Sequence, residues 1–567
     1  MTIQSFARIF LAGTIATWIG AYAYADTAGG FDGAGVSLSG SYLAARSAQT
    51  AQDLESAAAY FNVALAHDPG NPILIERALV LEVANGDIEA ALPLADRLVA
   101  LDPRNPVARL VRAVRDIKDG AFETAQAELA QSAQAPLSIL TGGLLGAWAG
   151  QGLGKVDAAL AAIDKLAGPS WYGIFKDYHS ALVADLAGRE DLAVKKISTA
   201  FDTDGTALRV VEAYGRIMAH WGRRDEAIAG LATFLAEQPN QPIIQDLLVA
   251  LKSGITPEPI AADARAGAAD VLYGIGSAIG TDQGTELPAA YLQLALYLTP
   301  ESDLTLMALG DLLLVSEHCA DAIDIYGRIS QASRLRRNAD IQSGICLDVL
   351  DRTDEAATLI KRVIDASPSD LEAVVALGNI YRGRDRFAEA AEIYSRGIAT
   401  IATPTQADWR IFYFRGVALE RSKQWKEAEA DLKKALELNP NQPQVLNYLG
   451  YSWVDFGQDL DEGLKMIKAA VDQRPNDGYI VDSLGWAYYR LGRYQEAVEQ
   501  LERAVELKPE DPVINDHLGD AYWKVDRKLE ATFQWNHARD LNPEPADLAK
   551  IVKKLESGMS GDVGNDG

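Results

Sequence analysis

The sequence has few of the side chains from which catalytic and metal sites are usually built. It contains two cysteines and six histidines among 567 residues. The histidines are scattered singly along the chain, at His67, His179, His220, His318, His517 and His537. Neither the His-Glu-x-x-His metal motif nor the Gly-x-Ser-x-Gly nucleophile motif occurs. We therefore predict that the protein is not an enzyme and that it has no cofactor, no metal and no small-molecule substrate.

Basic side chains are also scarce. Lysine and arginine number 53 against 79 aspartates and glutamates, which gives a formal net charge of −26. A nucleic-acid partner is excluded, because neutralising phosphates needs a basic stripe. Docking by charge on an anionic membrane is disfavoured for the same reason. Two interpretations stay open: a solvated acidic surface that keeps the protein soluble, or attraction to a basic partner.

Long apolar runs are missing except at the start of the chain. Arg8 and the apolar stretch Ile9–Tyr24 predict a secretory signal peptide over residues 1–25, cleaved between Ala25 and Asp26. A Gly-rich linker, residues 26–36, would follow. A retained anchor is the alternative, although the stretch is short for a membrane span. Because no cysteine lies near the cleavage site, the protein is not expected to be a lipoprotein.

The two cysteines, Cys319 and Cys346, fall on helices that should be antiparallel neighbours. In an exported protein two such residues are expected to pair. Closing this loop would stabilise the fold by roughly 3 kcal/mol. We predict a disulfide between them, with two buried thiols as the alternative.

Glycine recurs at a nearly fixed interval in the second half of the chain. The steps between the eight positions are 34, 34, 34, 38, 34, 35 and 34 residues. The positions are Gly276, Gly310, Gly344, Gly378, Gly416, Gly450, Gly485 and Gly519. Alanine and glycine continue this frame upstream, from Ala45 to Gly215. A period near 34 in helical segments is typical of a solenoid, in which each unit packs only on its neighbours.

Each unit carries two amphipathic helical patterns. In Asp477–Pro509 the first pattern places Val481, Leu484 and Gly485 on one face, and the second runs over Gln495–Leu507 with alanine and leucine inward. A proline follows the second helix, where it ends the helix without disrupting it. This pattern resembles the tetratricopeptide repeat (TPR) family. The resemblance implies an all-α, right-handed superhelical solenoid of about 13–14 helix-turn-helix repeats with a C-terminal capping helix.

The frame divides the mature chain into segments. Residues 37–239 should hold an N-terminal array of about six units, and residues 269–543 a C-terminal array of about eight. Residues 240–268 break the frame and are predicted to form an irregular helical link that acts as a hinge. Residues 544–557 should form the capping helix, and residues 558–567 a disordered tail.

The resemblance also implies where a partner would bind, because the first helix of each TPR unit lines the concave groove. Aromatic, amide and acidic side chains there would suit an extended peptide, the rings by apolar contact and the amide by hydrogen bonds to its backbone. The alternative is that several rings pack between units. The predicted groove residues are Tyr413, Asn447, Tyr451, Tyr479, Asp482, Trp486, Tyr489, Asp516, Asp520 and Trp523.

The whole layout resembles the periplasmic TPR adaptors of proteobacteria, most closely over residues 449–486. Those adaptors dock a carboxy-terminal processing serine protease and deliver substrates such as cell-wall hydrolases. We therefore expect a non-enzymatic scaffold in the periplasm of a Gram-negative bacterium, with peripheral outer-membrane association and homo-oligomerisation left open. Two alternatives remain: a holdase for exported unfolded chains such as apocytochromes, and a structural subunit of an envelope assembly or polysaccharide-export complex.

Overall fold

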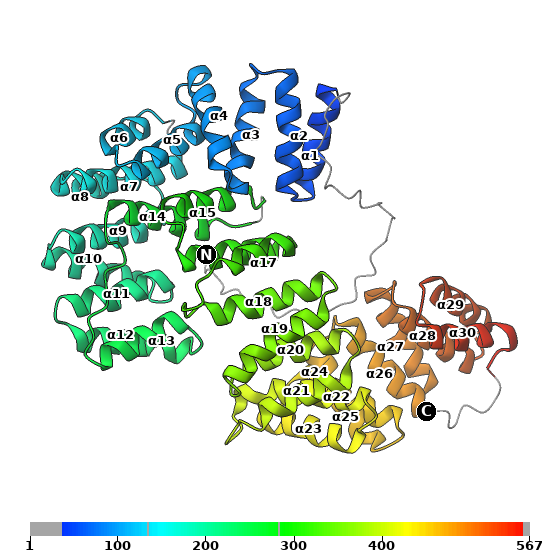
Figure 1. Cartoon of the computed structure of the whole chain (residues 1–567). Helices are drawn as coiled ribbons and strands as arrows, with labels where there is room; N and C mark the ends of the chain where they lie inside the picture. The colour runs from blue at the N-terminus through cyan, green and yellow to red at the C-terminus, as the bar shows by residue number, and fades with distance from the viewer. Residues whose placement is uncertain (1–36, 133–134, 282–283, 560–567) are drawn as a thin grey trace. The chain divides into compact units, whose positions relative to one another are not determined.

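The protein is all-α. The structure, a computed structural model, describes residues 37–132, 135–281 and 284–559, and in these ranges it contains thirty α-helices, one short 3-10 helix and no strand (Figure 1). The predicted signal peptide with its cleavage site, the linker and residues 560–567 of the predicted tail lie outside the described residues. No helix in the described part combines the length and the apolar content that a bilayer crossing needs.

The helices follow one another in antiparallel pairs. The first six pairs and the helix after them are α1 (Leu38–Thr50), α2 (Leu54–His67), α3 (Pro72–Asn85), α4 (Ile88–Leu101), α5 (Pro106–Lys118), α6 (Phe122–Ala130), α7 (Pro136–Gly152), α8 (Val156–Lys165), α9 (Tyr172–Leu186), α10 (Glu190–Thr203), α11 (Leu208–His220), α12 (Arg224–Glu237) and α13 (Pro242–Lys252). The next four pairs are α14 (Ala264–Ala278), α15 (Glu286–Leu298), α16 (Asp303–Val315), α17 (Cys319–Gly327), α18 (Arg336–Val349), α19 (Thr353–Ala366), α20 (Leu371–Gly383) and α21 (Phe387–Ile398). The last four pairs and the final helix are α22 (Trp409–Arg421), α23 (Trp425–Leu438), α24 (Pro443–Asp455), α25 (Leu460–Gln473), α26 (Gly478–Arg490), α27 (Tyr494–Leu507), α28 (Pro512–Lys524), α29 (Lys528–Asp540) and α30 (Pro545–Ser557). The described residues thus hold fourteen pairs, the single helix α13 and a terminal helix, which confirms the predicted fold class.

Local sequence signals set where these helices begin. Asp53 and Asp87 accept hydrogen bonds from the backbone N–H groups of Ser56 and Ala90, both at 2.9 Å, and so cap α2 and α4. Proline occupies the first position of α3, α5, α24 and α28, where its missing N–H costs nothing. Caps and prolines therefore fix the residues at which the helices of successive pairs begin.

The turn between the two helices of each pair contains a residue in the left-handed backbone region. In the first six pairs these residues lie 34 positions apart, at Gln52, Gly86, Gly120, Gly154, Gly188 and Gly222. Further left-handed residues follow in later pairs, at Glu317, Asp351, Asp385, Lys423, Gly457, Gly492 and Asp526. This second ladder gives every such turn the same shape, whether or not the residue is glycine.

The glycine ladder seen in the sequence lies between the two helices of a pair. A Cβ atom on Gly485 of α26 would lie 2.5 Å from Cγ of Leu501 on α27. A Cβ atom on Gly450 of α24 would lie 2.8 Å from the carbonyl oxygen of Gly463 on α25. Neither distance is sterically allowed, so these glycines let the paired helices approach closely, as expected.

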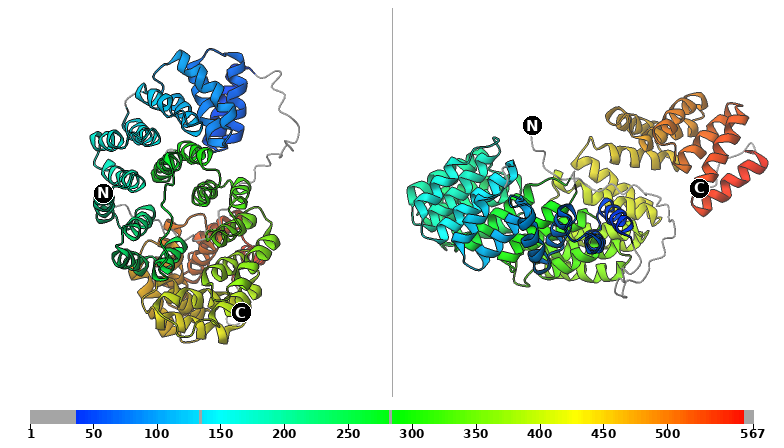
Figure 2. Two further views of the ribbon diagram at one scale, coloured as in Figure 1. Left: turned by 60° about the vertical axis from the view of Figure 1, so that its left-hand side comes forward. Right: turned by 90° about the horizontal axis from the view of Figure 1, so that it is seen from above.

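The chain forms two compact units, and the boundary between them differs from the predicted hinge. Unit 1 ends at Leu359 and unit 2 begins at Ile360, within α19. The segment 240–268 instead holds α13 and an irregular stretch, and it lies wholly inside unit 1. The physical reason is that α14 packs on α7 and α9, and α15 packs on α3 and α5 (Figures 1 and 2). Helices on both sides of the link therefore share one core.

The two cysteines lie side by side, and the structure does not show the predicted disulfide, which stays a prediction. Cys319 begins α17 and Cys346 lies in α18, and both are buried free thiols that hydrogen-bond with each other. Burial raises the pKa of both thiols. Because the thiolate is the reactive form in disulfide chemistry, such an environment disfavours oxidation.

Candidate protein-binding surface

Four first helices of unit 2 form the surface on which the predicted groove residues lie. We call α22, α24, α26 and α28 together the first-helix surface. Helix α26 packs on both α24 and α28. Helices α22 and α24 meet through the hydroxyl of Tyr448, which donates to Glu420 at 2.8 Å, and through the rings of Tyr413 and Tyr448, 6.1 Å apart. Stacking of successive repeats thus brings residues about 34 positions apart into one surface.

A column of three rings crosses from α26 to α28. The ring of Trp486 stacks on Tyr489, with centroids 4.8 Å apart, and on His517, with centroids 4.1 Å apart. Nδ1 of His517 lies 3.0 Å from Oδ1 of Asp482. Burial opposes a charge on His517, but the Asp482 carboxylate outweighs it, and the pKa of His517 is raised. Tyr489, Asp482 and His517 are buried, whereas Trp486 is only half-buried and keeps an edge on the surface.

The carboxylate of Asp455, on α24, lies next to this column of rings. The indole N–H of Trp486 donates to Oδ1 of Asp455 at 3.5 Å, and Arg490 pairs with the same oxygen at 3.1 Å. Tyr451, one turn before Asp455, is half-buried, and burial followed by the Asp455 charge raises its pKa. Asp455 itself is exposed, so a carboxylate stands beside the open edge of Trp486.

The two remaining predicted acids are covered by the last helix. Lys554 of α30 pairs with Asp516 at 2.8 Å and with Asp520 at 2.7 Å. The indole N–H of Trp535 donates to Asp520 at 2.9 Å. Burial raises the pKa of Asp520 to about 6, while Lys554 acts in the opposite direction. These acids therefore hold the capping helix in place and already have a cationic partner.

The buried side-chain oxygen of Asn447 on α24, Oδ1, has no hydrogen-bond partner among the described residues, and the same holds for Oδ1 of Asn515 on α28. Such atoms are rare in folded proteins, because an unpaired buried acceptor costs about 1–3 kcal/mol. Tyr413 of α22 is half-buried and contacts Tyr448, the residue next to Asn447. The oxygen of Asn447 is therefore a buried acceptor without a partner among the described residues, next to the half-buried rings of the first-helix surface.

Two predicted residues lie apart from this group. Tyr479, at the start of α26, is 48% exposed and lies 5.5 Å from Nζ of Lys508, which follows α27. Trp523, near the end of α28, is half-buried and packs 5.3 Å from the ring of Trp535. The structure thus brings Tyr451, Asp482, Trp486 and Tyr489 together, and it places the other aromatics around them.

Sequence reasoning missed four residues of this surface: Asp455, Arg490, His517 and Lys554. His517 lies 35 residues after Asp482, which is one repeat and one position further on. A search for contacts between the first helices of successive repeats would have found His517. Among the described residues, no group of three or more His, Cys, Asp or Glu side chains is placed to hold a metal ion.

Comparison with known families agrees with this architecture. A family model described as "TPR repeat" matches residues 485–526, and models described as "Tetratricopeptide repeat" match residues 409–442, 42–106 and 347–407. The class of protein defined by these matches and by the fourteen helix pairs is the TPR solenoid. Proteins of this class generally bind other proteins, and protein–protein interaction is the role that the fold supports.

Particular relatives share parts of the chain. A TPR repeat-containing protein of Pseudomonas aeruginosa is 24% identical over 190 residues, 33% of this chain and 31% of that protein. BBSome complex member BBS4 of Bos taurus is 34% identical over 110 residues, 19% of this chain and 20% of that protein. The chain therefore spans about a third or less of the length of these curated relatives.

Two solved structures align with the chain over different lengths and with low TM-scores. The APC/C hetero-tetramer Cut9–Hcn1 has 14% sequence identity and a TM-score of 0.37, and the alignment covers 91% of this chain and 96% of that one. MamA from Desulfovibrio magneticus RS-1 has 21% identity and a TM-score of 0.27, covering 31% of this chain and 95% of that one.

Proposed function

We propose that the chain is a non-enzymatic scaffold that binds an extended segment of a partner protein on the first-helix surface of unit 2. The observation that carries this proposal is the unpaired Oδ1 of Asn447 beside a run of half-buried rings. A peptide backbone supplies N–H donors of the kind that this oxygen lacks. The neighbouring rings supply apolar contact area at low entropy cost.

The charges favour a basic segment in the partner. Asp455 is exposed next to Trp486, and the whole chain carries a net charge of −26. A lysine or arginine of the ligand would compete with Arg490 for Asp455, which is more exposed than Asp516 or Asp520, while its aliphatic stem covers the indole ring. The acids Asp516 and Asp520 contribute less, because Lys554 already neutralises them.

The narrower form of the proposal concerns place and partner. We propose that the scaffold works in the periplasm and is an adaptor for a carboxy-terminal processing serine protease that acts on cell-wall hydrolases. The signal-like N-terminus supports export, and residues 449–486 carry the resemblance to such adaptors. A holdase for apocytochromes and a structural subunit of an envelope complex are the competing proposals.

The test separates binding from folding with the change Asn447→Leu. Removing an unpaired acceptor should leave the free energy of unfolding unchanged or raise it by ~1 kcal/mol. Loss of the ligand's hydrogen bond should weaken peptide binding about tenfold. Purified full-length protein is used to capture partners from a Gram-negative envelope extract, and affinity for each purified partner is then measured by calorimetry.

The matched control is Tyr479→Ala, which removes an exposed ring of the same helix that lies apart from the Trp486 column. Trp486→Ala should reduce binding, whereas Tyr479→Ala should not. A protease as the dominant partner supports the adaptor, apocytochromes support the holdase, and a stoichiometric outer-membrane complex supports the structural subunit. Unchanged affinity in both Asn447→Leu and Trp486→Ala would overturn the proposed surface.

A further inference from the structure

The inner surface of unit 1 is occupied by two helices of the same chain. Helices α3, α5, α7 and α9 are first helices of consecutive pairs, and α14 and α15 lie against them (Figures 1 and 2). We call α14 and α15 together the inner hairpin. In a solenoid each repeat normally contacts only its neighbours. The inner hairpin breaks this rule, because it contacts repeats that precede it by more than a hundred residues.

Polar contacts fasten the inner hairpin along the length of this surface. Asp270 of α14 accepts from the hydroxyl of Tyr178 on α9 at 2.8 Å and from Nε of Arg209 on α11 at 3.0 Å. On α15, Glu286 accepts from Gln49 of α1 at 2.7 Å, and the Tyr291 hydroxyl lies 3.0 Å from that of Thr141 on α7. The inner hairpin thus spans the surface from α1 to α11.

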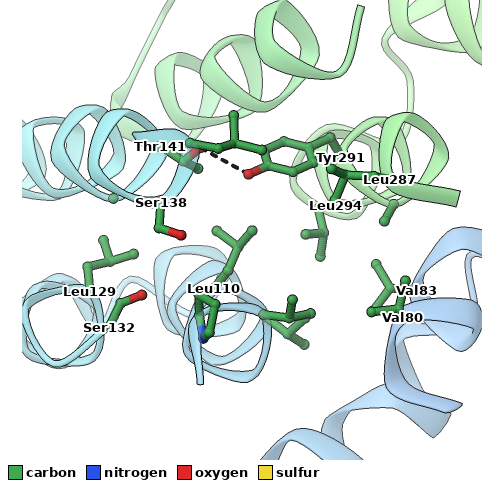
Figure 3. Close-up of a pocket in the computed structure, with 16 residues that line it drawn as sticks. Val80, Val83, Leu110, Leu129, Ser132, Ser138, Thr141, Leu287, Tyr291 and Leu294 are labelled. Carbon is green, nitrogen blue, oxygen red and sulfur yellow. Dashed lines mark hydrogen bonds between the residues drawn. The ribbon is translucent and has the colours of Figure 1, made fainter. Parts of the chain in front are cut away.

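Helix α15 presents the side-chain pattern of a ligand helix. Ala290, Tyr291 and Leu294 are buried where α15 meets α3, α5 and α7, and Leu287, which is 40% exposed, lines the same pocket (Figure 3). Their spacing of three, one and three residues is the i, i+3, i+4, i+7 pattern by which an amphipathic helix binds an apolar groove. The opposing wall is mostly apolar, with the hydroxyl residues Ser132, Ser138 and Thr141 among its lining, and its apolar members include Val80, Val83, Leu110, Leu129 and Leu137.

The fit between α15 and this wall is incomplete. A cavity of about 110 Å³ remains between them (Figure 3). Cores that have packed to completion seldom contain voids much larger than a water molecule. The surface can therefore accept a helix with larger anchors than Ala290 and Leu294.

An irregular segment leads into the inner hairpin on its N-terminal side, and Arg216 of α11 and Arg224 of α12 hydrogen-bond to its backbone at Glu258 and Gly254. Residues 253–263 join α13 to α14 without regular structure, and most of them are exposed. This segment holds the hairpin near its surface without adding a packed core of its own.

We propose that α3, α5, α7 and α9 form a helix-binding surface and that the inner hairpin is its intramolecular ligand. A partner protein would bind there through an amphipathic helix with bulky apolar anchors at i, i+3, i+4 and i+7, in exchange for α15. This inference concerns unit 1 alone and does not depend on the first-helix surface of unit 2.

The experiment weakens the intramolecular ligand and leaves the surface intact. The full-length variant Tyr291→Ala/Leu294→Ala is titrated with a fluorescent peptide of residues 286–299 that carries terminal lysines for solubility. The inner hairpin competes with the peptide, so the apparent affinity of the protein for the peptide falls in proportion to the fraction of molecules whose surface is open. Because this fraction is larger in the variant, the variant should bind the peptide at least about tenfold more tightly than the wild type. A peptide of the same composition with the four anchors out of register should not bind.

Two further variants keep the test decisive. Val80→Trp, added to the double variant to fill the cavity, should abolish the gained binding. If circular dichroism shows that the double variant has lost helix, Leu294→Ala alone replaces it. Dimerisation of a loosened variant would support the proposal, since the hairpin of a second copy would then occupy the surface. Equal binding of ordered and out-of-register peptides by a folded loosened variant would overturn it.

Discussion

At the scale of single residues, the closest helix contacts depend on glycines that no other residue can replace. Gly450 and Gly463 face each other across α24 and α25, and a Cβ atom on either would lie 2.8 Å from the other's carbonyl oxygen. The obstacle is backbone, which cannot rotate away as a side chain can. The pair therefore sets the spacing of these two helices.

We predict that Gly450→Ala lowers the free energy of unfolding of unit 2 by ~2 kcal/mol or more, because the helices must separate and lose packing. Gly383→Ala is the control, since no atom lies within 4 Å of a Cβ there. Urea unfolding followed by circular dichroism measures both. Equal stability of the two variants would show that α24 and α25 can separate at no cost.

Asp520 is a second residue whose environment predicts a measurable effect. Its folded-state pKa of about 6 lies above the ordinary value of 3.8, so the folded protein binds a proton that the unfolded chain has lost. The C-terminal end should thus become more stable as pH falls from 7 to 5, by ~1 kcal/mol. The raised pKa of His517 acts in the same direction.

Hydrogen exchange of α28–α30, corrected for intrinsic rates, would measure this gain at the two pH values. Asp520→Asn keeps an oxygen for the Trp535 indole but cannot titrate, so it should show a smaller gain. A wild-type end that loses protection as pH falls would contradict the assigned pKa direction.

At the scale of elements, the left-handed turn residues keep the steps of the glycine ladder in the second half of the chain and a strict 34-residue step in the first six pairs. In the first six pairs they lie 34 residues apart, and the longer step from Asp385 to Lys423 matches the longer step from Gly378 to Gly416. Turn geometry, not residue type, is the property that repeats. Lys423 and Glu317 adopt it despite the strain that a side chain brings to this region.

This ladder predicts opposite effects for two glycines with open surroundings. Gly154 has φ +73° and no atom near a would-be Cβ, so Gly154→Ala should lower stability by ~1 kcal/mol through backbone strain alone. Gly173, within α9 and equally open, should gain up to ~1 kcal/mol on replacement by alanine. Melting curves of the two variants would decide the matter, and a stabilising Gly154→Ala would refute the strain argument.

At the scale of the whole molecule, the sequence predicts what is periodic and misses what is long-range. The fourteen pairs and the capping helix follow from local signals such as glycine spacing, caps and prolines, and all appear where the frame puts them. The docking of α15 on α3 depends on three-dimensional complementarity between segments that share no spacing. For the same reason the break in period at residues 240–268 does not coincide with the boundary between the two compact units.

The same division holds for the candidate site. The resemblance to TPR proteins predicted Asp482, Trp486 and Tyr489, which lie on a single helix, as groove residues, and this stays a prediction. The contributions of neighbouring helices were not predicted, since His517 and Lys554 reach this surface only once repeats stack. Nor can periodicity show that a capping helix would neutralise Asp516 and Asp520.

The inner hairpin changes how unit 1 should unfold. A linear array of repeats frays from its ends, because each unit is held only by its neighbours. In unit 1, contacts such as that between Glu286 and Gln49, 237 residues apart, also join repeats that are distant in the sequence. Unit 1 should therefore open as one cooperative block, and it can complete its fold only after its first three hundred residues have been made.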